Sequence, residues 1–504
     1  MSQEIELKLT LPPRAVAALR RHPLVAAAPR LGPVQTLHNT YYDTPSLDLK
    51  AHKVAVRTRQ LGRNRLQTVK CAAVSGGGLS QRPEWEQPYG GTFDFSQVDA
   101  PATARLLARH AAALEPVFTT RFRRETRRHE PRTGVSILLM IDTGSIEVAT
   151  PDGEKRTDLI SELELELEHG APADLLELAC ELARDLPLMP ADASKAERGY
   201  RLFLQQPATL ARAEPSTISA DQDVVEAFRT LALSCLRQWQ ANASAAAHSH
   251  DPDFIHQLRV SQRRLRSLLK AFAPALPVEF VGEWNVRLRE NTNRFGDARD
   301  LDVLHMELID PVQPEGLPDA EGMARLLRLA ADARTAARRN AERNLDPAAQ
   351  GRLMLEFTAA LLRLPTGPLA AAADLRTFAR LRLARLRKRG RRQFDAAAGL
   401  VPVRLHALRI SFKELRYGIE FFAPLFPAKA TTRYIAALTR AQDTLGFLQD
   451  VDIAHGRLAA WAGENGGLRA AAAFILGWHG PRYARLRRRV LHDCEPLLWG
   501  KTPW

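Results

Sequence analysis

Hydrophobic and polar residues alternate strictly at the start of the chain. Residues 4–9 read Glu-Ile-Glu-Leu-Lys-Leu, so two acids and a lysine share one face and three aliphatic side chains share the other. Alternation with a period of two is typical of a β-strand with two different faces. Strand-like segments return at 36–43, 54–61, 65–73, 81–88, 117–129, 134–150 and 158–169. Eight strands with few long connections predict an antiparallel sheet or barrel.

The polar faces of these segments carry charges of both signs in an ordered way. Acidic residues gather on the first and last segments, and most arginines and lysines gather on those between them. The apolar reverse faces need cover, which the Ala- and Leu-rich helical patterns at 101–114 and 172–184 can supply. A solvated polar face is the ordinary explanation for any single strand, but the ordered distribution favours a charged interior. The pattern predicts an α+β fold that begins with an eight-stranded antiparallel tunnel or barrel under covering helices.

The charges predicted to line this interior suit one class of ligand. The four glutamates at alternate positions in 162–168 would stand about 6.8 Å apart along one strand face and repel each other unless a cation offsets them. Mg²⁺ and Mn²⁺ take carboxylate oxygens and usually share their site with substrate phosphates, and arginine binds phosphate through two parallel hydrogen bonds. The expected ligand is a metal-bound polyphosphate, and the expected reaction is phosphoryl transfer to water.

The charged segments also resemble a known family in their order along residues 1–205. The matching elements are Glu4-x-Glu6-x-Lys8, Arg57-x-Arg59, Thr68-x-Lys70, Arg82-x-Glu84-x-Glu86, Arg121 with Arg123, Asp142, the run 161–166, and Ser194-Lys195-x-x-Arg198-Gly199-Tyr200. This set resembles the CYTH, or triphosphate tunnel metalloenzyme, superfamily. The resemblance implies an eight-stranded tunnel that cleaves a triphosphate with a divalent metal.

The resemblance also implies roles for individual side chains. It implies catalytic roles for Glu4, Glu6 and Lys8. It implies Mg²⁺ or Mn²⁺ as the cofactor, with the metal held by Glu4, Glu6, Glu162, Glu164 and Glu166. It implies phosphate binding by Lys8, Arg57, Arg59, Lys70, Arg82, Arg121, Arg123 and Lys195. Three arginines compete near 121–124, and strand parity predicts that Arg124 faces away from the interior.

Most of the formal charge of +14 lies in the second part of the chain. Residues 1–205 hold 27 basic and 26 acidic residues, which leaves 44 basic and 31 acidic residues in 206–504. A Pro- and Ser-containing stretch at 206–222 is predicted to link a first domain at 1–205 to a second at 223–500. A basic domain predicts a polyanionic partner.

The second domain contains an internal repeat. Residues 254–276 match residues 404–426 with an ungapped offset of 150, and the same offset relates Gly296 to Gly446. The repeated motifs are His256-Gln-Leu-Arg with His406-Ala-Leu-Arg, and Asp300-x-Asp302 with Asp450-x-Asp452. Helical periodicity throughout predicts an all-α domain of two duplicated four-helix bundles, with halves at about 223–345 and 370–495.

Basic residues follow one face of a helix in each copy. The two stripes are His256, Arg259, Arg263, Arg266 and Lys270 in the first copy, and His406, Arg409, Lys413 and Arg416 in the second. A solvated face paired with the neighbouring aspartates is the alternative, but the repetition favours anion binding. The pattern resembles the CHAD domain over about 220–495. The resemblance implies that both stripes bind inorganic polyphosphate. The second copy carries Glu414 where the first carries Arg264.

Composition bounds the location and the partners. Four widely spaced cysteines indicate a reducing compartment. No secretory signal or membrane-spanning apolar run is visible, so we expect a cytoplasmic protein. The CHAD resemblance implies polyphosphate granules as a further location. No membrane partner is expected. Nucleic acid is not expected either, because the stripes lack aromatic side chains for base stacking.

The expected function joins the two domains through one class of ligand. The tunnel is expected to hydrolyse inorganic triphosphate to diphosphate and phosphate, while the helical domain binds long-chain polyphosphate. Two alternatives stay open. The same tunnel would also suit an adenylyl cyclase or a nucleoside triphosphatase, and a catalytically weak tunnel would leave a polyphosphate-binding scaffold.

Overall fold

The computed structural model describes residues 2–62, 64–71, 74–149, 154–247, 249, 251–312, 320–365 and 374–504, with the backbone alone at 2, 3, 74, 75 and 82. The chain separates into two compact units. The barrel unit comprises Met1–Thr209 and Asp346–Arg363, and the helical unit comprises Leu210–Leu345 and Leu364–Trp504. The ends of the predicted segments 65–73 and 134–150, and the start of the predicted second repeat at 370–373, lie outside the described residues. The predicted domain limits stay a prediction.

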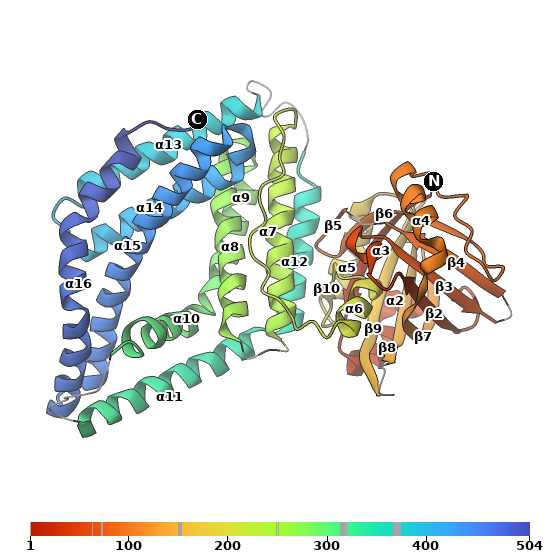
Figure 1. The fold of residues 1–504 in the computed structure, drawn as a ribbon, viewed down its shortest axis with the longest axis horizontal. Coiled ribbons are helices and arrows are strands. Elements are labelled where there is room, and N and C mark those ends of the chain that lie inside the picture. Colours follow the sequence, from red (N-terminus) through yellow and green to blue (C-terminus); the bar gives the residue numbers. More distant parts are fainter. Residues whose placement is uncertain are drawn as a thin grey trace. The chain divides into compact units, whose positions relative to one another are not determined.

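Within the described residues, eight antiparallel strands of the barrel unit close into a ring (Figure 1). The strands are β1 (Ser2–Thr10), β2 (Gln35–Asp43), β3 (Ala55–Leu61), β4 (Asn64–Lys70), β6 (Leu79–Pro88), β7 (Glu115–His129), β8 (Ser136–Ala149) and β9 (Lys155–His169). Their order is β1-β9-β8-β7-β2-β3-β4-β6, and β6 pairs back onto β1. Two short strands, β5 (Val74–Gly76) and β10 (Met189–Pro190), extend β6 and β1. The predicted eight-stranded antiparallel barrel is confirmed.

The apolar faces of the strands point outward and are covered by helices. Leu7 and Leu9 of β1 are fully buried in one core with Leu163 and Leu165 of β9. Burying each such side chain contributes about 1.5–3 kcal/mol. The covering helices include α1 (Val16–Arg21) and α5 (Pro172–Leu182), and α12 (Pro347–Leu362) adds to the same core. The barrel unit also contains α2 (Pro23–Ala27), α3 (Asp48–Ala51), α4 (Pro101–His110) and short 3₁₀ turns at Pro13–Ala15 and Ala111–Ala113.

One end of the barrel interior is apolar and filled by a helix. Helix α6 (Lys195–Phe203) begins with a capping box, in which Ser194 and Glu197 each satisfy the other's backbone N–H. The helix packs against β7, β8 and β9, and Tyr200 joins a core with Tyr41 and Phe118. Gly199 lies directly against the Phe118 ring, because an added Cβ would be 2.1 Å from Cε2 of that ring. The helix therefore stands closely on the interior wall.

The helical unit repeats its elements at the predicted offset (Figure 1). The first copy contains α7 (Val224–Ala246), α8 (Pro252–Phe272), α9 (Val278–Asn293), α10 (Gly296–Val303) and α11 (Ala320–Asn344), with a π-helix at Leu304–Ile309. The second contains α13 (Leu375–Ala396), α14 (Pro402–Phe422), α15 (Ala428–Ala462) and α16 (Gly466–Trp499). Helix α15 is continuous where the first copy divides into α9 and α10. The predicted all-α character is confirmed.

The two copies of the repeat share a core. Helix α8 packs against α14, and α11 packs against α16. One apolar cluster contains Leu304 and Met323 from the first copy and Val451 and Ile475 from the second. Ion pairs join the copies as well. Arg264 and Lys270 of α8 contact Glu420 and Glu414 of α14, so the substitution of Glu414 for Arg264 between copies supplies a partner across the interface.

Among the described residues, no helix combines the length and the apolar character needed to cross a membrane.

Candidate functional site

The interior face of β1 and its neighbours forms a chain of alternating charges. Glu4 accepts hydrogen bonds from Lys70 Nζ at 3.0 and 3.2 Å. Lys70 also lies 2.8 Å from Glu84 of β6, and the Arg57 guanidinium is 3.7 Å from the same carboxylate. Arg82 lies on β6 opposite Glu4, but its side chain is outside the described residues. The structure therefore brings together residues from β1, β3, β4 and β6 that are far apart in the sequence.

Two arginines of β3 face the interior, and one of them has an unused donor. Arg57 is 8% exposed, donates to the Tyr41 hydroxyl at 3.4 Å, and its buried Nε has no hydrogen-bond partner among the described residues. Arg59 donates to Asn39 Oδ1 at 3.1 Å. Repulsion from Arg57, together with burial, lowers the pKa of Arg59 to about 10. Two crowded guanidiniums with an unused buried donor are an arrangement that an anion would stabilise.

Three buried acids of β8 and β9 surround the ammonium group of Lys195. Asp142, Glu162 and Glu164 lie 2.9, 2.7 and 2.8 Å from Lys195 Nζ. Their oxygen atoms lie within 4.8 Å of one another, which is close enough to hold a metal ion. Burial alone would lower the pKa of Lys195, but the three acids raise it above its ordinary value. In this state the three carboxylates face three cations, which are Lys195, Arg124 and Arg198.

The arginines of β7 have the opposite orientation to the one that parity predicted. Arg124 points into the barrel and contacts Asp142 at 2.6 Å and Glu164 at 2.5 Å. Arg121 and Arg123 are exposed and share the other face of the strand with Glu125. The expected orientation is corrected because Thr120 and Phe122, which alternate with these arginines, are buried inside the barrel with Arg124. Both faces of β7 carry arginine, so the sequence pattern does not distinguish them.

A second group of acids lies on β1 and β9, outside this triad. Glu6 is 3% exposed, accepts a hydrogen bond from Ser80 Oγ at 3.1 Å, and faces Glu166 directly across β1 and β9. Lys8 Nζ is 4.0 Å from Glu6. Burial and the charge of Glu4 raise the pKa of Glu166 to about 7, with Glu6 and Glu84 adding to the effect. A divalent cation would stabilise the charged form of these acids, and carboxylate oxygens are the donors that Mg²⁺ and Mn²⁺ take. The residues present therefore fit such an ion.

Three interior residues were given no role from the sequence. Asp142 stood in the matched motifs without an assigned function, and Arg124 was expected outside the barrel. Arg198 of α6 donates to Glu162 Oε1 at 2.6 Å and to Asp158 Oδ2 at 2.9 Å, which fixes the acid that Lys195 also contacts. The spacing Lys195-x-x-Arg198 on one helical face was the available signal for this pair.

In the helical unit, the two basic stripes converge into one site. Helices α8 and α14 pack together and bring His256, Arg259 and Arg263 close to Arg409 and Lys413; we call these five residues the cationic cluster. Burial, then Arg299 and Arg263, lower the pKa of His256 to about 3. Burial, then Arg263 and Arg409, lower the pKa of Lys413 to about 6. Burial and the neighbouring cations thus both disfavour the charged forms, while Asp300 near Arg259 and Asp450 near Arg409 act in the opposite sense.

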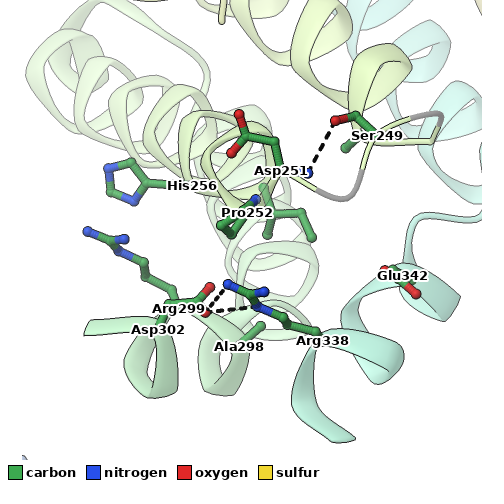
Figure 2. A pocket seen from close by; sticks show the side chains of 11 residues that line it. Ser249, Asp251, Pro252, His256, Ala298, Arg299, Asp302, Arg338 and Glu342 are labelled. Carbon is green, nitrogen blue, oxygen red and sulfur yellow. Dashed lines mark hydrogen bonds and ion pairs between the residues drawn. The ribbon is translucent and has the colours of Figure 1, made fainter. Parts of the chain in front are cut away.

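A pocket opens beside this cluster. Figure 2 shows the Arg299 side chain of α10 lying below the His256 ring, with both residues lining the pocket. On the same wall Arg338 of α11 donates to Asp302 Oδ1 at 2.9 Å. Asp302 thus pairs with arginines of α11 and not with the basic stripes, with which the solvated-face alternative expected it to pair. The cationic cluster therefore reaches this pocket through His256, and Arg299 adds a further positive charge to the pocket wall.

Repeated glycines explain how the central arginines fit. A Cβ added at Gly296 would lie 3.5 Å from Nη1 of Arg259, and one added at Gly446 would lie 3.4 Å from Nη2 of Arg409. Each arginine thus crosses the neighbouring helix where that helix has no side chain. The offset of 150 residues relates Arg259 to Arg409 and Gly296 to Gly446, so both copies of the repeat contain the same arginine–glycine contact.

The other stripe residues lie against polar partners. Lys270 contacts Glu414 at 2.9 Å, and Arg416 contacts Glu420 at 2.6 Å. Arg266 donates to Asn285 Oδ1 at 3.2 Å, and His406 shares a hydrogen bond with Gln449. These four side chains are engaged in packing the helices. In the cationic cluster, Arg259 and Arg263 donate to the Thr292 carbonyl and the Tyr417 hydroxyl, which are neutral groups, so the cluster is the stronger anion-binding candidate.

Comparisons with known proteins agree with this division. A family model for the CYTH domain matches residues 2–200, and one for the CHAD domain matches residues 230–459. An inorganic triphosphatase of Haemophilus influenzae is 31% identical over 218 residues, which cover 41% of this chain and 56% of that protein. An uncharacterized protein of Mycobacterium tuberculosis is 26% identical over 305 residues, 58% of this chain and 57% of its own.

The chain thus spans a little over half the length of these curated relatives. Among solved structures, the CHAD domain from the plant Ricinus communis is 29% identical, with a TM-score of 0.47, and the match covers 56% of this chain and 96% of that one. With the closed barrel and its charged interior, the duplicated helices and both matching family models, this chain contains a CYTH domain followed by a CHAD domain.

Proposed function

We propose that the barrel hydrolyses inorganic triphosphate to diphosphate and phosphate with Mg²⁺ or Mn²⁺. The observation that carries the proposal is a closed barrel whose interior holds carboxylates on β1, β8 and β9 and crowded guanidiniums on β3. The Haemophilus influenzae relative, named an inorganic triphosphatase, supports the same reaction.

The basic interior residues would bind the substrate phosphates, and the acidic ones would hold the metal. Arg57, Arg59 and Lys70 line the wall facing the acids, and their donors would bind phosphate oxygens and keep the chain of phosphates extended. Glu4, Glu6 and Glu166 would hold the metal, with Glu162 and Glu164 released to it only if Lys195 turns to the substrate. A bound divalent ion supplies positive charge to the phosphate oxygens as the leaving group departs. Lys8, beside Glu6, would stabilise the same oxygens.

Helix α6 favours an inorganic substrate over a nucleotide. Tyr200, Tyr41 and Phe118 fill one end of the interior, and Tyr200 is fixed by donating to Asp43 Oδ2 at 2.8 Å. A nucleoside would therefore have to remain at the opposite end. Nucleoside triphosphatase or adenylyl cyclase activity in the same barrel is the alternative, and a catalytically weak scaffold is a second.

Phosphate release tests these alternatives directly. The full chain would be incubated with tripolyphosphate, ATP or long-chain polyphosphate, with Mg²⁺, Mn²⁺ or EDTA. Metal-dependent release from tripolyphosphate well above that from ATP would support the proposal. Preferred turnover of ATP, or formation of cyclic AMP, would favour the nucleotide alternatives, and no release from any substrate would favour the scaffold.

We further propose that the cationic cluster binds long-chain polyphosphate. Five basic side chains from two copies of the repeat face one another at a half-buried site, and a polyanion would relieve their repulsion. Such binding would place the protein on polyphosphate granules in the cytoplasm. Competition between polyphosphate and RNA for the full chain distinguishes this ligand from nucleic acid.

Polyphosphate binding is expected to take up a proton at Lys413. In the free protein, burial and the charges of Arg263, Arg409 and Arg416 lower the pKa of Lys413 to about 6, with Asp450 acting in the opposite sense. A bound polyanion raises this pKa, so above pH 6 the complex holds more protons than the free protein. Affinity should therefore fall as the pH rises from about 6 to 8, by up to about tenfold per pH unit for one proton.

Titration calorimetry in buffers of different ionisation enthalpy measures this uptake. Lys413→Arg keeps the charge at every pH and should remove the dependence, whereas Lys429→Arg, at an exposed position on α15, should leave it unchanged. Equal affinities at pH 6 and pH 8 for the wild-type chain would contradict the expectation.

A further inference from the structure

Helix α12 lies between the two copies of the helical repeat in sequence, yet it belongs to the barrel unit. It packs against α5 and β10. Leu355 and Ala359 of α12 are buried in the outer core together with Leu186 and Leu188. The core that covers β1 is therefore completed by a segment more than a hundred residues beyond the last barrel strand.

Polar contacts from the second turn and from the C-terminal end of this helix hold it on α5. Arg352 Nε donates to the carbonyl of Ala183 at 3.0 Å, and Nη2 donates to that of Arg184 at 2.5 Å. Carbonyls at the end of a helix lack partners within the helix, so an arginine supplied from outside satisfies them. At the other end Arg363 contacts Glu177 at 2.7 Å.

Gly351 allows the backbones to meet. A Cβ at this position would lie 1.8 Å from the carbonyl oxygen of Leu188 and 3.1 Å from Cα of Met189. Neither neighbour is a flexible side chain that could turn away. The approach of α12 to the start of β10 therefore requires glycine here.

The contacted segment leads directly to the charged interior. Met189 and Pro190 of β10 pair with Thr10 and Leu9 of β1, and the Ala191 amide donates to the carbonyl of Lys8 at 2.9 Å. Asp192 then accepts the Gly78 amide at 2.9 Å, three residues before Lys195 enters the barrel. Leu188, on which α12 rests, is thus joined to both Lys8 and Lys195 through a short, hydrogen-bonded stretch.

We infer that α12 supports the charged interior of the barrel. It holds β10 against β1 and so positions Lys8 and Lys195. The catalytic consequence rests on the proposed triphosphatase function, whereas the positioning itself does not. The inference makes Gly351 and Arg352 positioning residues, and it makes the second half of the chain necessary for an ordered interior in the first.

Gly351→Ala in the full chain tests the inference, with Gly456→Ala as the matched control. Both change a helical glycine to alanine, but a Cβ at Gly456 meets nothing within 4 Å. By hydrogen exchange, the Ala191 and Gly78 amides should exchange at least about tenfold faster in Gly351→Ala only. Arg352→Ala, which adds no atoms, should show a smaller change of the same sign if Gly351→Ala does not fold. Exchange at Ala191 equal to that of the control in both variants would overturn the inference.

Kinetics separates positioning from general stability. At a temperature where both variants are fully folded by circular dichroism, kcat/KM for tripolyphosphate should fall about tenfold in Gly351→Ala, mainly through KM, because Lys8 and Lys195 are expected to bind phosphate. Polyphosphate affinity of the helical unit should stay within twofold. Faster exchange with unchanged kcat/KM would overturn the positioning role. If the wild-type chain releases no phosphate, the triphosphatase proposal fails, and the exchange result still decides the role of α12.

Discussion

Glu6→Gln is expected to lower metal-dependent kcat/KM for tripolyphosphate by at least about a hundredfold. Glu6 is buried on the interior face of β1, directly opposite Glu166 and 4.0 Å from Lys8. The substitution removes the negative charge that a divalent ion needs at the centre of this site. Losing even a residue that supports a metal ligand commonly costs 10–100-fold, so losing a ligand itself should cost more.

The fold should survive this change. Glutamine has nearly the same volume as glutamate, and its carbonyl oxygen can still accept the hydrogen bond from Ser80 Oγ. The melting temperature of the variant should therefore stay close to that of the wild-type chain. Phosphate release over a range of Mg²⁺ and Mn²⁺ concentrations measures the effect.

An exposed glutamate provides the control. Glu115→Gln, at the start of β7, makes the same change of charge away from the interior and should leave kcat/KM unaltered. Wild-type activity in Glu6→Gln, with normal metal dependence, would remove Glu6 from the site and would direct attention to Asp142, Glu162 and Glu164 as the metal-holding acids.

The double substitution Arg259→Ala and Arg409→Ala is expected to weaken polyphosphate binding about a hundredfold. These arginines occupy equivalent positions in the two copies, each lying against a glycine of the neighbouring helix. A hydrogen bond to a charged group contributes about 1.5–3 kcal/mol, which corresponds to roughly tenfold or more per arginine.

Salt dependence gives a second measure of the same change. Binding to a polyanion releases counterions, and each phosphate contact that is lost lowers the slope of log K against log salt by about one. The double variant should therefore show a slope lower by about two. Removing Arg105 and Arg109, both exposed on α4, changes the net charge equally and should alter neither affinity nor slope. Unaltered binding by the Arg259/Arg409 variant would place the polyphosphate site elsewhere.

The barrel and the duplicated helices could be predicted because their signals are local. Alternation in 4–9 defines a strand with two faces whatever surrounds it, and the ungapped offset of 150 requires two similar helical units. The charged interior followed from the order of acids and bases on successive strands. Its chemistry could be stated before any contact was known, because carboxylates and guanidiniums in one cavity suit few ligands.

The orientation of β7 could not be predicted in the same way. Arginine occurs on both faces of this strand, at 121, 123 and 124, so alternation of polar and apolar residues carries no information about which face is inside. The register against β8 decides the matter, because it places Arg124 opposite Asp142. Register depends on contacts between strands, which no single segment contains.

The sequence by itself therefore determined the elements, their periodicity, the duplication and the class of charges on each face, because these follow from the covalent order of side chains on helices and strands. Only the tertiary structure decided which faces meet: that Lys195 enters the barrel among three acids, that two basic stripes join in one cationic cluster, and that α12 packs against α5 and β10. The sequence of an amphipathic helix such as α12 predicts that the helix packs against an apolar surface. It does not identify that surface, because the packing depends on shape and contacts across the whole chain.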